Sequence, residues 1–261
     1  MPHCSGLASD TQPETTAPVI FEHASPIDPH QSILIIGHRG AAGLLPENTL
    51  PSFARACELG VGAVELDVHS VEDRLVVIHD DTLGRTTNAT GPVTARSVAG
   101  LQMLDAGGGA GVPLLDEVFQ LLPKCIGINV ELKGANTALS LARFLGDHGD
   151  RDVLVSSFDH AALTAFRHVC TKVAVAPLFG RWRPNVWQLA EGLGAWSINL
   201  SARIATPERI AQAHRLGYRV LVYTVNDLNA AAPLVESAVD GVFTDYPDRI
   251  TPDSLGGSIL C

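Results

Sequence analysis

Two histidines stand where short apolar runs end, and their side chains are suited to proton transfer. His38 is followed by Arg39, and His79 is followed by Asp80. Imidazole titrates near neutral pH, so a pair of histidines can supply one general acid and one general base. A single histidine at such a position is more often structural, so catalysis requires further chemical groups around the pair.

Carboxylates with strand-like spacing provide such groups. Glu65 and Asp67 are two residues apart, and Glu131 and Lys133 repeat that spacing. Side chains two apart share one face of a strand, and the apolar residues between them place these four toward the interior. Buried carboxylates that lie close together are unfavourable without a counter-charge. An all-oxygen set without cysteine suits Mg²⁺ or Ca²⁺ better than zinc, so we predict that Glu65, Asp67 and Glu131 bind a divalent cation.

Positive charge accompanies these residues. Arg39, Lys133 and a divalent cation around one point would clamp a phosphate group or a phosphoryl transition state. With two histidines, this set indicates phosphodiester cleavage, in which one histidine activates the nucleophile and the other protonates the leaving alkoxide. Three alternatives stay open: interior polar residues that pair with one another, a metal-assisted isomerase or lyase, and a phosphate-binding protein without catalysis.

The elements that must position these residues form a repeating pattern. Apolar, β-branched runs alternate with segments of helical periodicity, which is typical of βα units around a parallel sheet. Residues 69–73 are too few to cross over between parallel strands, so the second and third runs form an antiparallel hairpin. Eight parallel strands remain, which predicts an α/β fold of the (β/α)8 TIM-barrel class. The runs are 33–37, 63–68, 74–79, 127–133, 152–158, 172–178, 196–200, 219–225 and 241–245.

Two stretches lie outside this alternation. Residues 1–31 are rich in proline, serine and threonine, and we predict a flexible N-terminal arm there, followed by the catalytic domain over 32–261. Residues 82–113 include the glycine-rich run 107–111. We predict that this stretch is a small insertion after the second barrel strand, on the catalytic face.

The overall composition excludes several classes of protein. The chain has 261 residues, 46% hydrophobic and 18% charged, which suits a globular barrel of ~250 residues. A net charge of -10 argues against binding to nucleic acid, and the apolar runs fall short of the ~20 residues that span a membrane. Five scattered cysteines without a CxxC motif predict reduced thiols. We therefore expect a cytoplasmic monomer or weak homo-oligomer that acts on a small molecule.

The same residues fall in segments that resemble a known family, the glycerophosphodiester phosphodiesterases. The resemblance implies a (β/α)8 barrel that hydrolyses glycerophosphodiesters to glycerol 3-phosphate and an alcohol, with Mg²⁺ or Ca²⁺. It runs from about Ile33 to Ile250, in the family's order. The segments are HRGAAGLLPENT (38–49), VELDV (64–68), VVIHDDTLGRTT (76–87), VELK (130–133), SSF (156–158), YTVN (223–226) and GVFTDYPD (241–248).

The resemblance also implies a role for each matching residue. Tyr223 stands where the family commonly has tryptophan, and its ring is implied to line the glycerol or leaving-group pocket. Two questions stay open: which histidine is the base, and whether water or the substrate's glycerol hydroxyl attacks first. A lysophospholipase D-like activity on a lipid is the alternative function. The implied roles are acid–base catalysis for His38 and His79, metal binding for Glu65, Asp67 and Glu131, phosphate binding for Arg39 and Lys133, support of Arg39 or the metal site for Glu47, and orientation of His79 for Asp80.

Overall fold

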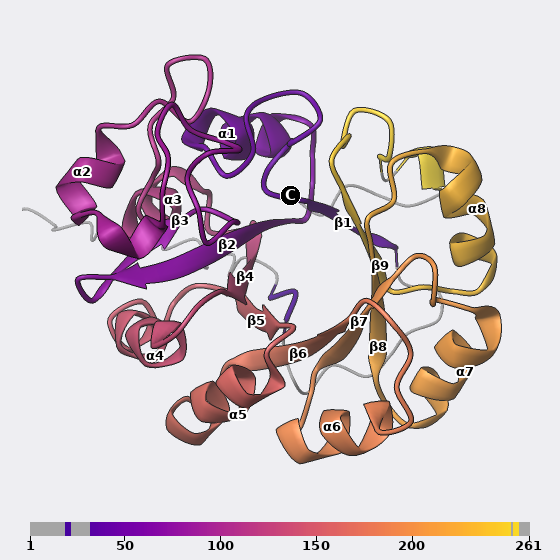
Figure 1. Ribbon diagram of the computed structural model, residues 1–261. Helices are drawn as coiled ribbons and strands as arrows, with labels where there is room; N and C mark the ends of the chain where they lie inside the picture. The colour runs from indigo at the N-terminus through magenta and orange to yellow at the C-terminus, as the bar shows by residue number, and fades with distance from the viewer. Residues whose placement is uncertain (1–18, 22–31, 252, 256–261) are drawn as a thin grey trace, which may run out of the picture.

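The computed structural model describes residues 19–21, 32–251 and 253–255, in which a ring of strands is surrounded by helices (Figure 1). Strand β1 pairs in parallel with both β2 and β9, and this double pairing closes the ring. The prediction of a (β/α)8 barrel is confirmed. Its parallel strands are β1 (Leu34–Gly37), β2 (Ala63–Val71), β4 (Gly127–Leu132), β5 (Val153–Ser157), β6 (Ala174–Phe179), β7 (Ser197–Ser201), β8 (Arg219–Tyr223) and β9 (Gly241–Thr244).

The remaining strand, β3 (Arg74–Val77), runs antiparallel to β2, as the short connection predicted. Glu72 and Asp73 make the turn with φ of 50° and 58°. Left-handed residues at both central positions match the twist of a two-residue hairpin. Strand β2 extends to Val71, beyond its predicted end, because its last residues pair with β3.

Helices cover the outside of the barrel (Figure 1). The N-cap of the first helix is Thr49, whose hydroxyl accepts a hydrogen bond from the Ser52 N–H at 3.4 Å. None of the helices in the described part of the chain has the length and apolar content to cross a membrane. They are α1 (Leu50–Glu58), α2 (Val98–Gln102), α3 (Leu115–Leu121), α4 (Thr137–Gly146), α5 (His160–Val169), α6 (Val186–Leu193), α7 (Pro207–Arg215) and α8 (Leu228–Glu236), with 3-10 turns at Val93–Ala95 and Asp253–Leu255.

Alternation along β2 separates the packing residues from the polar ones. Val64 and Leu66 are fully buried in the main hydrophobic core, which lies between the strands and the helices. Glu65 and Asp67 point the other way, into the barrel. The parallel register aligns Asp67 with Glu131 on β4, so backbone pairing itself brings these two carboxylates together.

The segment predicted as an insertion, 82–113, packs against the β2–β3 hairpin. It contains α2, and its apolar side chains bury one another in a hydrophobic cluster separate from the main core. Met103 is the exception, with 86% of its surface exposed. The cluster consists of Val71, Val76, Ile78, Leu83, Val93, Val98, Leu101, Ala106, Val112 and Leu114.

At the opposite end of the barrel, Phe21 closes the interior. Its side chain is 4% exposed, and its ring meets that of Trp196 edge-on with centroids 5.3 Å apart. The backbone N–H of Ile20 donates a hydrogen bond to the Asp152 carboxylate at 2.5 Å. The prediction of a flexible arm over 1–31 is therefore wrong at Phe21, because the barrel interior takes up this apolar side chain. Residues 1–18 and 22–31 of that prediction lie outside the described residues.

We expect Phe21→Ala to lower the free energy of unfolding by about 3 kcal/mol, because it removes a buried ring and leaves a cavity. Urea denaturation would measure the change. Val19, which is 58% exposed, offers a neighbouring control, and Val19→Ala should change stability by less than about 0.5 kcal/mol. Equal losses in the two variants would contradict the closing role of Phe21.

Two of the five cysteines agree with their prediction. Cys57 and Cys170 are free thiols. Cys4 and Cys261 lie outside the described residues.

Candidate active site

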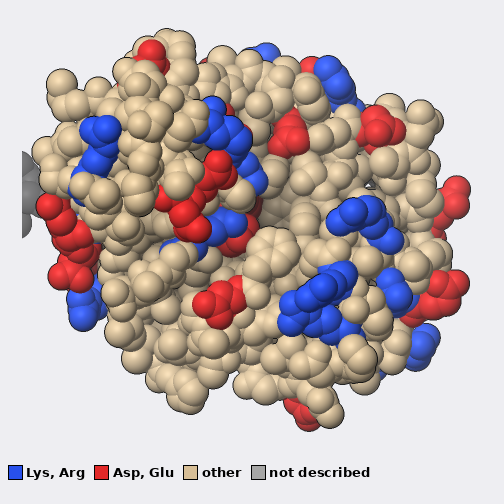
Figure 2. All heavy atoms as spheres, in the orientation of Figure 1, with Lys and Arg blue, Asp and Glu red and all other residues tan. Residues whose placement is uncertain are grey.

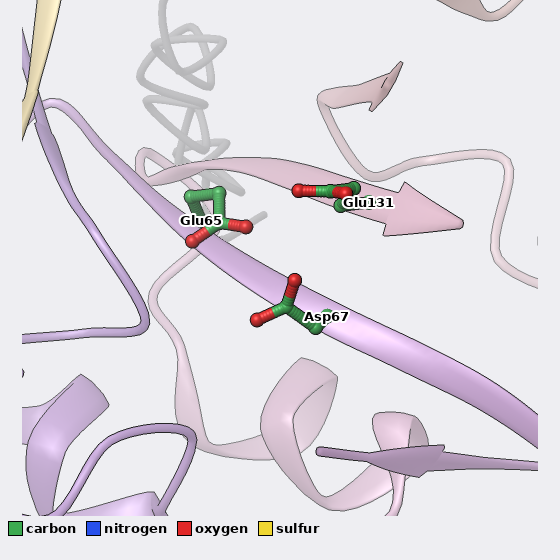
Figure 3. A group of neighbouring side chains, drawn as sticks. All are labelled: Glu65, Asp67 and Glu131. Atoms are coloured by element: carbon green, nitrogen blue, oxygen red, sulfur yellow. The ribbon is translucent and has the colours of Figure 1, made fainter. Parts of the chain in front are cut away.

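Three carboxylates from two neighbouring strands meet at the C-terminal end of the barrel (Figure 3). Glu65 and Asp67 come from β2 and Glu131 from β4, and one oxygen of each lies within 4.8 Å of the others. All three are buried. Asp67 Oδ1 has no hydrogen-bond partner among the described residues, although Lys133 Nζ lies 3.3 Å away. Buried oxygens with one of them unsatisfied fit a hard divalent cation.

Burial also changes the proton affinity of these carboxylates. Burial, reinforced by the charge on Asp67, raises the pKa of Glu65 to about 8 and that of Glu131 to about 7. Burial would raise the pKa of Asp67 as well, but Lys133 and Arg39 outweigh it and hold that pKa below its usual value. The glutamates therefore need further positive charge to ionise fully at neutral pH, and a bound cation would provide it.

Asn48 holds Asp67 in place. Its Nδ2 donates a hydrogen bond to Asp67 Oδ2 at 2.8 Å, and its Oδ1 accepts one from the Asp67 backbone N–H at 3.3 Å. The backbone of Asn48 is left-handed, with φ of 57°, a conformation that asparagine adopts more readily than most residues. Asn48 was not predicted as a site residue, although its place in the PENT segment was a usable signal.

His38, directly after β1, is held by a chain of hydrogen bonds. Its Nδ1 lies 2.6 Å from Asp245 Oδ1, and Asp245 Oδ2 accepts a hydrogen bond from Asn226 Nδ2 at 2.7 Å. This leaves His38 Nε2 facing the carboxylates, 3.9 Å from Glu65 Oε2. Burial alone would lower the pKa of His38, but the hydrogen bond to Asp245 and the charge on Glu65 outweigh it and raise that pKa.

His79 follows β3 and has a comparable support. Its Nδ1 lies 2.6 Å from Asp80 Oδ1. The Arg85 guanidinium donates hydrogen bonds to both Asp80 and Glu47, at 2.6 to 2.9 Å. Arg85 holds the pKa of Asp80 well below its usual range, so this carboxylate stays ionised. Burial lowers the pKa of His79, and the nearby Asp67 and Asp80 offset only part of that effect.

Two cationic side chains flank the carboxylates. Arg39 donates a hydrogen bond from Nη1 to Glu47 at 2.7 Å, and its Nε lies 3.3 Å from Asp67 Oδ2. Lys133 Nζ lies 2.5 Å from Glu131 Oε1. Arg39 Nε is buried without a hydrogen-bond partner among the described residues. Both cations therefore offset part of the negative charge of the carboxylates.

These groups surround one cavity of about 240 Å³. Figure 2 shows it as a hollow near the centre of the face, with acidic and basic side chains gathered on its left. On the other side, the Tyr223 ring meets Phe158 and Phe243 edge-on, and the three form an apolar wall.

Of the predicted site residues, the cavity is lined by His38, Arg39, Glu65, His79, Glu131 and Tyr223. The other four predicted residues do not line the cavity but contact residues that do. They are Asp67, Lys133, Glu47 and Asp80.

Comparison with known proteins identifies the family of this chain. A sequence model of the glycerophosphoryl diester phosphodiesterase family matches residues 38–249. The chain belongs to this family. Two glycerophosphodiester phosphodiesterases are similar over nearly their whole lengths. That of Caldanaerobacter subterraneus is 31% identical over 232 residues, which is 83% of this chain and 96% of the relative. That of Bacillus altitudinis is 33% identical over 239 residues, 82% and 95% of the two chains.

A solved structure shares the barrel of this family member. It is a phosphodiesterase from Oleispira antarctica in complex with the product sn-glycerol-3-phosphate. The two structures align with a TM-score of 0.78 and 29% sequence identity, over 82% of this chain and 93% of the other.

Several residues that hold the histidines were not predicted. Asp245 and Asn226 follow β9 and β8, and their polar side chains at strand ends were the available signal. His69 is 2% exposed, and its Nε2 lies 3.2 Å from the backbone oxygen of His79. Arg85 lies in the stretch predicted as an insertion, where no periodicity indicates which side chains face the site.

Proposed function

We propose that this family member hydrolyses glycerophosphodiesters to glycerol 3-phosphate and an alcohol. One observation carries the proposal. Two histidines, each held at Nδ1 by a carboxylate, line the same cavity as a buried acidic set that can bind a cation. Proton transfer at two positions and charge neutralisation at a third are what phosphodiester cleavage requires.

We infer that His38 and His79 act as the acid–base pair. Because Asp245 and Asp80 engage their Nδ1 atoms, Nε2 is the atom of each ring that exchanges a proton with the substrate. One histidine takes the proton of the attacking hydroxyl, which belongs to water or to the substrate's own glycerol. The other donates a proton to the oxygen of the leaving alcohol.

Glu65, Asp67 and Glu131 would hold Mg²⁺ or Ca²⁺. When bound, such an ion stabilises the negative charge that develops on the phosphoryl oxygens. Asn48 keeps the Asp67 carboxylate oriented for this task, and Lys133 shares the charge of both Asp67 and Glu131.

Arg39 and Lys133 would bind the phosphate group of the substrate. Guanidinium and ammonium groups beside a phosphate form strong, charge-assisted hydrogen bonds. Glu47 orients Arg39 and is itself held by Arg85. Tyr223 supplies part of the wall against which an organic group of the diester packs.

Release of glycerol 3-phosphate from glycerophosphocholine and glycerophosphoethanolamine tests the proposal. We expect release with Mg²⁺ or Ca²⁺ and none with EDTA. Purified protein that releases no glycerol 3-phosphate with either ion would contradict the proposal.

A lipid substrate is the alternative, and the same experiment separates the two when lysophosphatidylcholine is added as a third substrate. The stretch 82–113 offers little apolar surface for an acyl chain, because Leu83, Val93 and Leu101 are fully buried. We therefore expect faster choline release through glycerophosphocholine cleavage than through lysophosphatidylcholine cleavage. The opposite order would favour the lysophospholipase D-like activity.

Loss of the hydrogen bond between His38 and Asp245 should change kcat more than KM. We expect Asp245→Asn to lower kcat about 10²-fold or more, because an amide can present a donor where His38 Nδ1 needs an acceptor. KM should change by less than about threefold, since Asp245 does not line the cavity. Steady-state kinetics would show the split. Asp227→Asn, at the exposed N-cap of α8, is a control for the same chemical change, and an equal loss of kcat in that variant would contradict the prediction.

A further inference from the structure

A second pocket, of about 360 Å³, adjoins the catalytic cavity, and three arginines line it: Arg181, Arg183 and Arg203. Phe158 and Leu178 line both spaces, so the two meet at these side chains. Figure 2 shows basic side chains gathered to the lower right of the central hollow, on the side where α6 and α7 lie in Figure 1. We call this second space the arginine pocket.

The loops that carry these arginines are anchored. Trp182, between Arg181 and Arg183, meets the Trp187 ring edge-on with centroids 5.5 Å apart, and the Arg209 guanidinium lies 4.3 Å from its centroid. On the other loop, Ile204 packs against the main core next to Arg203. The guanidinium groups therefore project from fixed backbone, which reduces the entropy lost when they bind a ligand.

The charge of the arginine pocket is not neutralised within the part of the chain that the structure describes. Arg181, Arg183 and Arg203 are exposed, and none makes an ion pair with a described carboxylate. The arginines on the other side of the cavity differ, because Arg39 and Arg85 are both paired with Glu47. Three like charges around one pocket, in a chain of net charge -10, favour an anionic ligand.

The boundary between the two spaces carries a polar group without a partner. The Tyr223 hydroxyl is buried and has no hydrogen-bond partner among the described residues. It faces Gly180, where a Cβ atom would lie 4.0 Å from the hydroxyl oxygen and 3.8 Å from the Phe158 ring. A ligand that crosses from the cavity to the arginine pocket would pass this hydroxyl and could accept its hydrogen bond.

We propose that the arginine pocket binds a phosphate group on the alcohol arm of the diester, so that the preferred substrate is a glycerophosphodiester whose alcohol is itself phosphorylated. This inference rests on the proposed function and specifies its substrate class. The reacting phosphate occupies the cavity, and the alcohol arm extends past Phe158 and Tyr223. Guanidinium groups bind phosphate oxygens in pairs, whereas they repel a cationic arm such as choline.

Three diesters with matched glycerol arms test the proposal. They are glycerophosphoglycerol, the same diester with a phosphate monoester at the end of its second glycerol, and glycerophosphocholine. The wild-type protein should show a kcat/KM about tenfold higher for the phosphorylated diester than for glycerophosphoglycerol, and a lower value for glycerophosphocholine. The ratio of kcat/KM for the phosphorylated diester to kcat/KM for glycerophosphoglycerol should fall toward one as salt is raised to about 1 M, because the arginines are exposed.

Arginine variants test whether the preference for the phosphorylated diester comes from the arginine pocket. The triple variant Arg181→Gln, Arg183→Gln and Arg203→Gln should bring the ratio for the two glycerol-arm diesters to within about twofold of one. Arg215→Gln is the matched control, because Arg215 is an exposed arginine in the last turn of α7, and it should keep the wild-type ratio. Thermal melting would verify that each variant is folded, and single Arg→Gln variants would replace a triple variant that does not fold.

Each outcome has a distinct meaning. A wild-type protein that cleaves glycerophosphoglycerol without preferring its phosphorylated form would overturn the inference and leave the proposed function intact. A preference that survives in the arginine variants would overturn the assignment to this pocket. Inactivity toward all three diesters, with Mg²⁺ or Ca²⁺, would contradict the proposed function, and the inference would fall with it.

Discussion

Replacing His38 with alanine is expected to lower kcat for glycerophosphodiester hydrolysis about 10²- to 10⁴-fold, the usual contribution of a positioned general acid or base. The expectation follows from its position, because His38 lines the cavity and its Nδ1 is engaged by Asp245. Release of glycerol 3-phosphate at saturating metal would measure the loss. His79→Ala should cause a loss of similar order.

A histidine outside the site provides the control. His168 is exposed on α5, and its Nδ1 lies 2.9 Å from the Thr164 oxygen of the same helix. His168→Ala should keep kcat within about twofold of the wild-type value. The acid–base assignment would be abandoned if His38→Ala, folded and loaded with metal, retained more than about a tenth of the wild-type kcat.

Removal of divalent metal is expected to abolish activity and to lower the melting temperature by about 5 to 10 °C. Ligands that bind only the folded state stabilise it by mass action, by about 3 to 4 kcal/mol at 100 to 1,000 times Kd. Here the effect should be large because Glu65, Asp67 and Glu131 are buried close together and lose a counter-charge when the ion is removed. Differential scanning fluorimetry with and without EDTA would measure it, and no activity is needed for that measurement.

A variant of one carboxylate tests whether the change in melting temperature comes from metal bound at the acidic cluster. Asp67→Asn keeps the size of the side chain but removes a charge from the cluster, so added Mg²⁺ or Ca²⁺ should raise its melting temperature far less than that of the wild-type protein. Asp150→Asn is the control, because Asp150 lies on the surface and pairs with Lys124. A metal-induced shift of the same size in Asp67→Asn and wild type would place the ion elsewhere.

The barrel and most of its strands could be predicted because their information is local. Alternation within 63–68 already separated Val64 and Leu66 from the inward carboxylates, and the short connection to 74–79 required the hairpin. Six of the side chains that line the cavity could be predicted for the same reason, since polar residues at the ends of parallel strands meet at one face.

The supports of His38 and His79 were harder to predict, because they depend on contacts across the fold. Asp245 reaches His38 from the last strand, and Arg85 joins Glu47 to Asp80 from a stretch without periodicity. The burial of Phe21 depends on such distant contacts as well. Spacing in the sequence reports which residues share a face, not which faces meet.

The placement of His79 has a consequence for how this protein would lose activity on heating. His79 follows β3, which is outside the barrel ring. Val76 of β3 packs in the separate hydrophobic cluster of the hairpin and residues 82–113, whereas Leu75 and Val77 pack in the main core. Cooperative units of this kind can open while the rest of a domain stays folded. Opening of this unit would displace one member of the proposed acid–base pair while the barrel persists. Inactivation would then precede global melting, and amide hydrogen exchange would be faster in β3 than in β4 or β5.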